Sequence, residues 1–336
     1  LVSNVSTSTL TNKSGNISMW TNDSGYLTSY TEADTLQSVT ARGDTTNQRI
    51  LMNGSGSDAY LYVAGNAANN QPTNNNPWLN PTPKHPFNVF NDFNHESAAT
   101  KYHVYRFIRH WLTEYKVDGF RWDLSKGFTQ VNSGSNVGAW GNYDASRIAI
   151  WKNYYDSMQA VAPGSYCILE HFGGDQEEIE LANYGMLLWN NLNYESNQNT
   201  MGYINNSTLY RAYAPYKGYT KLGLISYAES HDEERLMYKN INFGFTNSNY
   251  DVKSLNIGLQ RMEALNALML LIPGAKMYWQ FGELGYDYSI NTCVNGTVNN
   301  NCRLDPKPIR WDYLQNTYRK RLKEVVGSIS RLRAYK

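Results

Sequence analysis

The sequence lacks any run of about 18 consecutive apolar residues, so no segment of it is expected to cross a membrane. It also lacks an excess of charge of one sign, because 30 lysine and arginine residues stand against 29 aspartate and glutamate residues. A dedicated nucleic-acid binder would show a basic surplus or stripe, so nucleic acid is not an expected partner. The first ten residues have no basic segment followed by an apolar one, and no signal peptide is expected.

Cysteine is scarce, and no histidines or cysteines are spaced like ligands of a metal ion, so no metal site is expected. Of the 3 cysteines, Cys293 and Cys302 flank a short polar stretch. A disulfide closing this loop would suit an oxidising compartment, and it favours an extracellular location. Cys167 lies in an apolar run and is expected to be a buried thiol.

Aromatic residues, in contrast, are abundant. The chain has 27 tyrosines and 9 tryptophans, while only 18% of its residues are charged. Tyrosine and tryptophan combine a flat apolar face with a polar edge, which suits contact with sugar rings. A soluble protein that is merely rich in tyrosine fits this composition equally well.

The first 59 residues differ from the rest, since they are rich in serine, threonine, asparagine and glycine. Residues 11–20 (TNKSGNISMW) and 21–30 (TNDSGYLTSY) repeat the pattern Thr-Asn-x-Ser-Gly in register. Turn-forming pairs between short alternating stretches indicate β or irregular structure. This leader resembles the stalk repeats of phage tail-fibre-like proteins, which implies a virion-associated location. A disordered polar leader is the alternative.

The remainder, 60–336, is expected to begin with a loop region over 60–97 and to continue as strand–helix units over 98–336. Apolar runs alternate with segments of helical periodicity, which predicts an α/β fold with five parallel strands. The expected strands lie in 117–124, 165–171, 186–191, 222–232 and 275–283, and helices are expected near 100–115, 144–160, 254–271 and 314–332.

Carboxylates follow three of these apolar runs: Asp123, Glu170 and Asp232. In a parallel α/β barrel, active groups gather at the carboxyl ends of the strands. A retaining glycosidase needs a carboxylate nucleophile and a carboxylic acid roughly 5–5.5 Å apart, which neighbouring strands can supply. Arg121 lies on the same face as Asp123 and would keep it ionised, whereas the apolar residues before Glu170 would raise its pKa.

The segments GFRWDLSKG, ILEH and ESHDEE, in this order, resemble short regions that define the α-amylase family, glycoside hydrolase family 13. The resemblance covers about 60–325 and implies a (β/α)8 TIM barrel acting on an α-linked glucan. It implies Asp123 as nucleophile, Glu170 as acid/base and Asp232 as the third carboxylate that grips the sugar. Substrate contact is implied for the residues Arg121, His231, Lys126, Asp92 and Asn94, while Gly127 replaces the family's usual histidine.

The alternation starts with what resembles the fourth barrel strand, so an incomplete barrel of about five βα units is expected. The absent region would supply groups that hold the sugar and the usual calcium ligand, which leaves calcium undecided. Five strands leave two open edges, and these edges and the leader are consistent with a homo-oligomer.

Two other functions stay open, namely a non-catalytic carbohydrate binder and a fibre-associated structural protein. Impaired turnover would follow from the loss of positioning groups. Among the remaining acidic residues, Glu177, Glu178 and Glu180 are expected on a solvated helix face, and Glu233 and Glu234 likewise.

Overall fold

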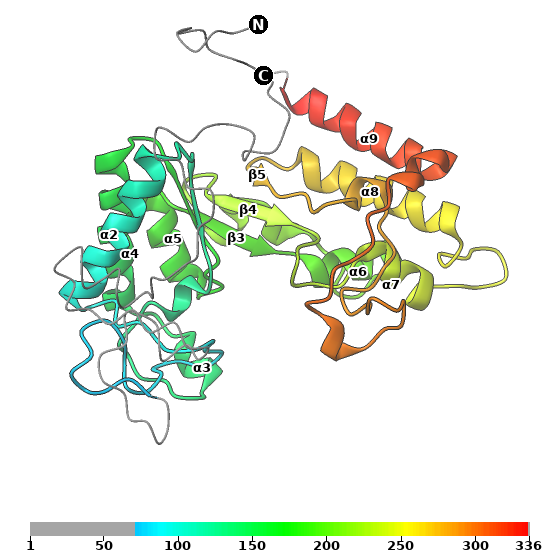
Figure 1. Ribbon diagram of the computed structural model, residues 1–336. Helices are drawn as coiled ribbons and strands as arrows, with labels where there is room; N and C mark the ends of the chain where they lie inside the picture. Colours follow the sequence, from blue (N-terminus) through cyan, green and yellow to red (C-terminus); the bar gives the residue numbers. More distant parts are fainter. Residues whose placement is uncertain (1–70, 335–336) are drawn as a thin grey trace, which may run out of the picture. The chain divides into compact units, whose positions relative to one another are not determined.

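The structure is a computed structural model that describes residues 71–334. The predicted leader, its repeat and the boundary after residue 59 lie outside these residues and stay predictions. Strands and helices alternate along the described chain (Figure 1). The strands are β1 (Gly119–Trp122), β2 (Tyr166–Leu169), β3 (Leu187–Asn191), β4 (Leu224–Tyr227) and β5 (Ala275–Lys276). The helices are α2 (Ala98–Thr113), α3 (Val137–Trp140), α4 (Ala145–Val161), α5 (Asp175–Tyr184), α6 (Asn193–Met201), α7 (Leu236–Phe243), α8 (Leu255–Leu271) and α9 (Thr317–Ala334).

All the strands belong to one parallel sheet in the order β1-β2-β3-β4-β5. β1 and β2 pair from Gly119 with Tyr166 to Trp122 with Leu169. Sequence order and spatial order agree, as expected when each helix carries the chain to the next parallel strand. The predicted α/β fold with five parallel strands is confirmed. The last strand is shorter than predicted and ends at Lys276.

The local sequence explains where the helices begin. The carboxylate of Asp144 accepts hydrogen bonds from the backbone N–H groups of Ser146 and Arg147, at 2.9 and 3.2 Å, and so caps α4. Ser97 caps α2 in the same way through the N–H of Ala99. Each cap satisfies donors that the first turn leaves free and contributes about 1 kcal/mol.

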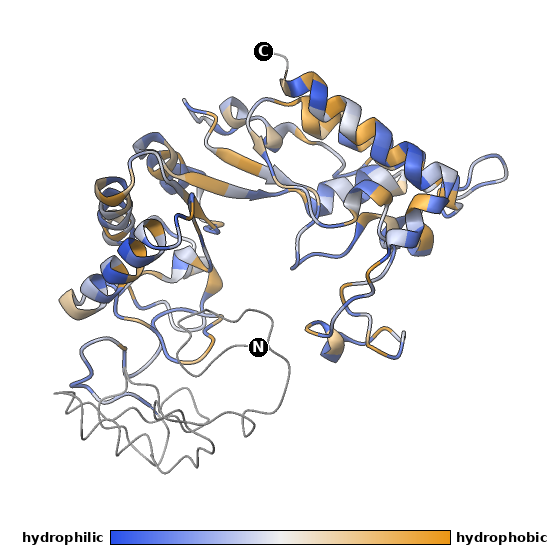
Figure 2. Ribbon diagram, turned by 45° about the horizontal axis from the view of Figure 1, so that its top comes forward, coloured by the Kyte–Doolittle hydropathy of each residue, from blue (hydrophilic) through white to orange (hydrophobic). Residues whose placement is uncertain are grey.

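The two faces of the sheet have different roles. Side chains alternate along a strand, so Phe120 and Trp122 point to one face and Arg121 to the other. The first face packs against α2, α4 and α5 around a core that includes Ile108, Trp151, Leu169, Leu188 and Leu224. Figure 2 shows the hydrophobic colour of the strands in this region. Burial of each large apolar side chain contributes roughly 1.5–3 kcal/mol.

A second core lies beneath α6, α7, α8 and α9. It contains Leu259, Met262 and Leu265 from α8, and Leu322 and Val326 from α9. The helices α8 and α9 lie side by side (Figure 1). None of the described helices is long and apolar enough to span a lipid bilayer.

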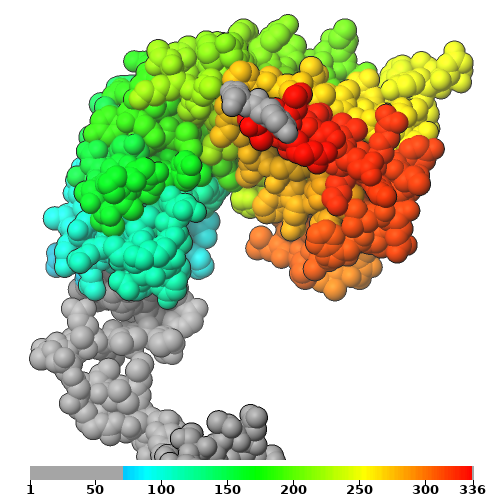
Figure 3. Space-filling view, turned by 90° about the horizontal axis from the view of Figure 1, so that it is seen from above, coloured from blue at the N-terminus to red at the C-terminus, as the bar shows by residue number. Residues whose placement is uncertain are grey.

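Within the described residues the sheet does not close on itself, because β1 and β5 are its edge strands. Figure 3 shows the surface hollowed between the segment coloured cyan and the segment coloured orange. The face that would line a barrel carries Trp189, Ile225 and Tyr227, with Ile168 and Met277 partly buried beside them.

Candidate active site

Asp123 and Glu170 follow the paired ends of β1 and β2, and one arginine joins them. The Nη1 atom of Arg121 donates a hydrogen bond to Oδ1 of Asp123, and its Nη2 atom lies 3.0 Å from Oε1 of Glu170. The guanidinium stacks over the ring of Trp189, 4.0 Å from the ring centroid. The two carboxylates are therefore no farther apart than one guanidinium can span.

Burial is the main reason why the pKa of Glu170 is raised above its ordinary value. The charge of Asp123 and a hydrogen bond shared with it raise this pKa further, while Arg121 and the backbone N–H of Leu124 lower it. That N–H lies 2.9 Å from Oε2 of Glu170. The backbone of Leu124 is in the left-handed conformation, with φ of 45°, and in this conformation its N–H group points toward the carboxylate of Glu170. Strained backbone of this kind is common at functional sites.

Asp232 and His231 lie in the loop after β4. Arg303 donates a hydrogen bond to Oδ1 of Asp232, and Nε2 of His231 lies 3.3 Å from Oδ2 of the same carboxylate. The imidazole of His231 lies between Trp189 and Trp279, with ring centroids 6.1 and 5.8 Å away. Trp189 thus contacts both Arg121 and His231.

The buried phenol of Tyr227 lies within reach of the charges of several of these groups. Its pKa is raised first by burial and then by the negative charges of Glu233, Glu170 and Asp232, while Arg121 lowers it. Among residues 71–334, the Tyr227 hydroxyl finds no hydrogen-bond partner. The charges of acidic residues that follow β2 and β4 therefore both act on Tyr227, which lies on the side of the sheet that carries Trp189.

Three of the residues for which substrate contact was predicted have other partners. Asp92 accepts hydrogen bonds from the side chain of Asn80 and the backbone of Lys84, at 2.8 and 3.0 Å. Asn94 caps the turn before α2. The Nζ atom of Lys126 donates to the carbonyl of Phe172 at 2.9 Å. No contact recorded between residues 71 and 334 joins these three to the carboxylates.

A histidine from another segment fills the space beside Gly127. A Cβ atom at position 127 would lie 2.6 Å from Nε2 of His85. The His85 ring stacks on Trp140 with centroids 5.4 Å apart, and its Nε2 atom lies 3.5 Å from Oδ1 of Asp92. Glycine at position 127 is therefore explained by this close approach.

The expectation that Glu177 and Glu178 lie on a solvated face is wrong, because their side chains are almost fully buried. Glu177 accepts hydrogen bonds from Nε and Nη2 of Arg147 at 2.6 and 2.8 Å. It also lies 2.8 Å from Nε2 of His171. Burial opposes the ionisation of Glu177, but hydrogen bonds from His171 and Arg147 outweigh it and lower its pKa to about 2.

This buried cluster supports the loops that carry Asp123 and Glu170. Nδ1 of His171 lies 3.0 Å from the hydroxyl of Ser125, and the N–H of Ser125 donates to the carbonyl of Glu170 at 3.0 Å. The partners are distant in sequence, so no periodic pattern reveals the cluster. The contacts of Arg303 and Glu233 were missed for the same reason, and Glu233 accepts a hydrogen bond from Asn191 at 2.5 Å.

The structure joins Cys293 and Cys302 in a disulfide, and Cys167 is a buried thiol. Between residues 71 and 334, the one group of three potential metal ligands consists of these two bonded cysteines and Asp305. A disulfide sulfur is not a thiolate, so this group does not suit a metal ion.

The buried imidazole of His95 predicts a loss of stability in acid. Burial lowers its pKa from 6.5 to about 3, so the unfolded chain binds a proton more readily between these values. The free energy of unfolding is therefore expected to fall as the pH drops from about 6.5 toward 3, by up to about 1.4 kcal/mol per pH unit. Urea unfolding measured at several pH values tests this.

The variant His95→Asn should remove the fall in the free energy of unfolding with decreasing pH. His110→Asn, on an exposed helix position, should keep it. An unchanged slope in His95→Asn would contradict the assignment.

No protein-family model matches the sequence, and neither does any curated protein. Eubacterium rectale Amy13B is 15% identical over 71% of this chain and 48% of that chain, with a TM-score of 0.50. Pullulanase from Anoxybacillus sp. LM18-11, complexed with maltotriose, is 14% identical over 72% of this chain and 34% of that chain, also with a TM-score of 0.50. The chain thus spans less than half the length of either structure. These likenesses concern the fold alone, and they agree with a partial (β/α) barrel in the described residues.

Proposed function

We propose that this chain is a member of the α-amylase family and acts on an α-linked glucan as a retaining glycoside hydrolase. The observation that carries the proposal is the position of Asp123 and Glu170 on adjacent parallel strands, bridged by Arg121. The pKa of Glu170 is raised, which suits a proton donor. Asp123 is exposed and bound to a cation, which suits a nucleophile.

The two acids have separate roles in the proposed reaction. The Asp123 carboxylate attacks the anomeric carbon while Glu170 gives its proton to the glycosidic oxygen, and the carbon–oxygen bond to the leaving sugar breaks. Glu170 then takes a proton from water, whose oxygen attacks the same carbon and releases Asp123. Asp232 and His231 bind sugar hydroxyls, and the ring of Trp279 lies beside His231.

The substrate class is supported by the aromatic residues beside the carboxylates and by the fold. Trp189, Tyr227, His231 and Trp279 form a continuous set of ring contacts beside the carboxylates. The pullulanase of similar fold is complexed with maltotriose, an α-linked glucan. Arg121 and the carboxylates offer several polar partners for hydroxyl groups, as sugar binding requires.

The direct test is the product formed from soluble starch and maltotriose, followed by reducing-sugar release and by proton NMR. Retention predicts that the α-anomer appears first and then equilibrates. The variant Asp123→Asn serves as the blank. Initial release of the β-anomer would exclude the retaining mechanism. Binding of maltotriose by the wild type without turnover would instead support a non-catalytic carbohydrate binder.

The pH dependence of the reaction is expected to report Glu170. The acid must be protonated to donate, so kcat/KM should fall as the pH rises through its pKa. Because that pKa is raised, the fall should occur at higher pH than for an ordinary glutamate. Glu170→Gln is expected to lose about 10²–10⁴-fold in activity together with this basic limb. Glu263→Gln, which alters another glutamate paired with an arginine, should keep the limb. A basic limb that survives in Glu170→Gln would assign the acid elsewhere.

A further inference from the structure

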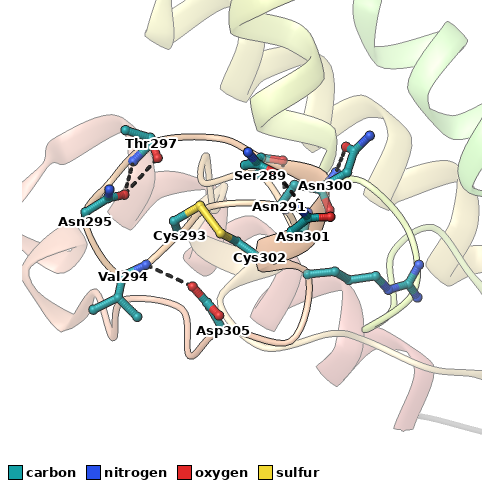
Figure 4. The surroundings of a disulfide bond; sticks show 12 residues. Ser289, Asn291, Cys293, Val294, Asn295, Thr297, Asn300, Asn301, Cys302 and Asp305 are labelled. Carbon is teal, nitrogen blue, oxygen red and sulfur yellow. Dashed lines mark hydrogen bonds between the residues drawn. A yellow bond between two sulfur atoms is a disulfide. The ribbon is translucent and has the colours of Figure 1, made fainter.

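A loop closed by a disulfide lies beside the candidate site. Cys293 and Cys302 are bonded, with Cα atoms 4.9 Å apart (Figure 4). Inside the loop, the N–H of Cys293 donates to the carbonyl of Thr297 at 2.7 Å, and the N–H of Cys302 donates to that of Asn299 at 2.9 Å. Arg303 is the next residue, so closure of the loop fixes the backbone from which its side chain extends.

Hydrogen bonds connect the chain just before the loop to the segment that carries Asp232. Glu234, two residues after Asp232, accepts hydrogen bonds from the hydroxyl of Ser289 and the N–H of Ile290, at 2.6 and 3.0 Å. On the other side of the loop, Nζ of Lys307 donates to the carbonyls of Cys302 and Asp305, both at 2.8 Å. Hydrogen bonds therefore hold the chain on both sides of the loop. Those before the loop, at Ser289 and Ile290, connect it to Glu234 in the segment that carries Asp232.

Arg303 contacts Asp232 from this fixed position. Its Nη2 atom donates to Oδ1 of Asp232, while His231 lies near the other oxygen of the carboxylate. The side chains of Arg303 and Asp232 are 44% and 37% exposed, so solvent or a sugar reaches both. An exposed ion pair adds little to stability, and its main effect is to hold the carboxylate in one orientation.

We propose that Arg303 is a positioning residue that orients Asp232 toward the sugar, and that it does so only while Cys293 and Cys302 are joined. The inference rests on the proposed function of Asp232 in glucan binding. The guanidinium occupies one carboxylate oxygen and leaves the remaining lone pairs to sugar hydroxyls. Without the disulfide, the backbone at Arg303 gains freedom and the pair loses its fixed geometry.

The first experiment is a double-mutant cycle between Arg303 and Asp232, measured as kcat/KM on maltotriose. Arg303→Ala is expected to lower kcat/KM about tenfold, and Arg303→Lys to retain most of it. In an Asp232→Asn background, Arg303→Ala should cause no further loss, because the carboxylate that it orients is gone. Thermal melting of each variant should stay near that of the wild type. Arg321→Ala, which removes an exposed arginine paired with Glu263, should change none of these values.

The second experiment addresses the disulfide. Dithiothreitol supplies two electrons and two protons, giving two thiols in the loop and a cyclic disulfide in the reagent. Reduction of the wild type, or the change Cys293→Ser with Cys302→Ser, should reproduce the loss seen in Arg303→Ala. Reduction of Arg303→Ala should add nothing. Cys167 is a buried free thiol and does not take part in the exchange.

Each outcome decides the proposal. An unchanged kcat/KM in Arg303→Ala, or an equal loss with and without Asp232, would overturn the positioning role. Insensitivity of the wild type to reduction would overturn the role of the disulfide. The proposed function is judged separately. It stands if the wild type is active and Asp123→Asn is not, even when the results for Arg303 or the disulfide contradict this inference. If both the wild type and Asp123→Asn are inactive and maltotriose does not bind, the proposed function fails and this inference fails with it.

Discussion

Replacing Asp123 by asparagine is expected to lower kcat on starch by about 10⁴-fold. Asparagine keeps the shape of the side chain but cannot form the glycosyl ester of a retaining reaction. The Asp123 side chain is 78% exposed, so the change should leave folding intact. Reducing-sugar release measures the loss, and maltotriose binding by calorimetry should be retained within a few fold.

The chain offers a matched control for this substitution. Asp312 is also exposed and is also paired with an arginine two residues before it, Arg310. Asp312→Asn therefore breaks the same kind of contact at a position without a proposed role in the reaction. Activity should stay at the wild-type value. Equal losses in Asp123→Asn and Asp312→Asn would show that the effect is not specific to the candidate site.

The second large effect concerns stability. Arg147→Ala is expected to lower the free energy of unfolding by about 3–5 kcal/mol, because it leaves Glu177 buried without its ion-pair partner. Arg147 is 1% exposed. Besides Glu177, its guanidinium donates to the carbonyls of Lys126 and Asn142 at 3.1 and 3.0 Å. Urea unfolding at neutral pH measures the change.

Two further variants identify the cause of this loss. Arg321→Ala removes an arginine whose side chain is 63% exposed, and it should cost less than about 1 kcal/mol. Adding Glu177→Ala to Arg147→Ala should cost less than the sum of the single changes, since the second substitution removes the unpaired charge. Strict additivity would mean that the two side chains do not depend on each other.

Local pattern was sufficient to predict the order of the strands and the place of Asp123 and Glu170 after two of them. Asp123 and Glu170 each follow a short apolar run, and side-chain alternation places Arg121 on the face of Asp123. Parallel pairing then brings the three together, since β1 and β2 are neighbours in the sheet. No long-range information is needed for this part of the site.

The remaining contacts depend on residues that are far apart in the sequence. Arg303 reaches Asp232 across 71 positions, and Arg147 reaches Glu177 across 30. The predicted solvation of Glu177 was wrong because periodicity identifies a helix face but not the charged partner that faces it. The contacts of Lys126 with the carbonyl of Phe172 and the ring of Trp140 also come from distant positions, and its contact with substrate stays a prediction.

The close approach of His85 to Gly127 makes the side chains at these two positions depend on each other. A side chain at 127 would collide with the imidazole at 85, whose Nε2 atom lies 2.6 Å from the position of the added Cβ. A side chain at 127 therefore requires the imidazole of His85 to move or to be replaced by a smaller group, and a smaller group would leave an unfilled space beside Trp140. The side chains at positions 85 and 127 are therefore expected to change together, and His85→Ala should make a larger residue at 127 easier to accommodate.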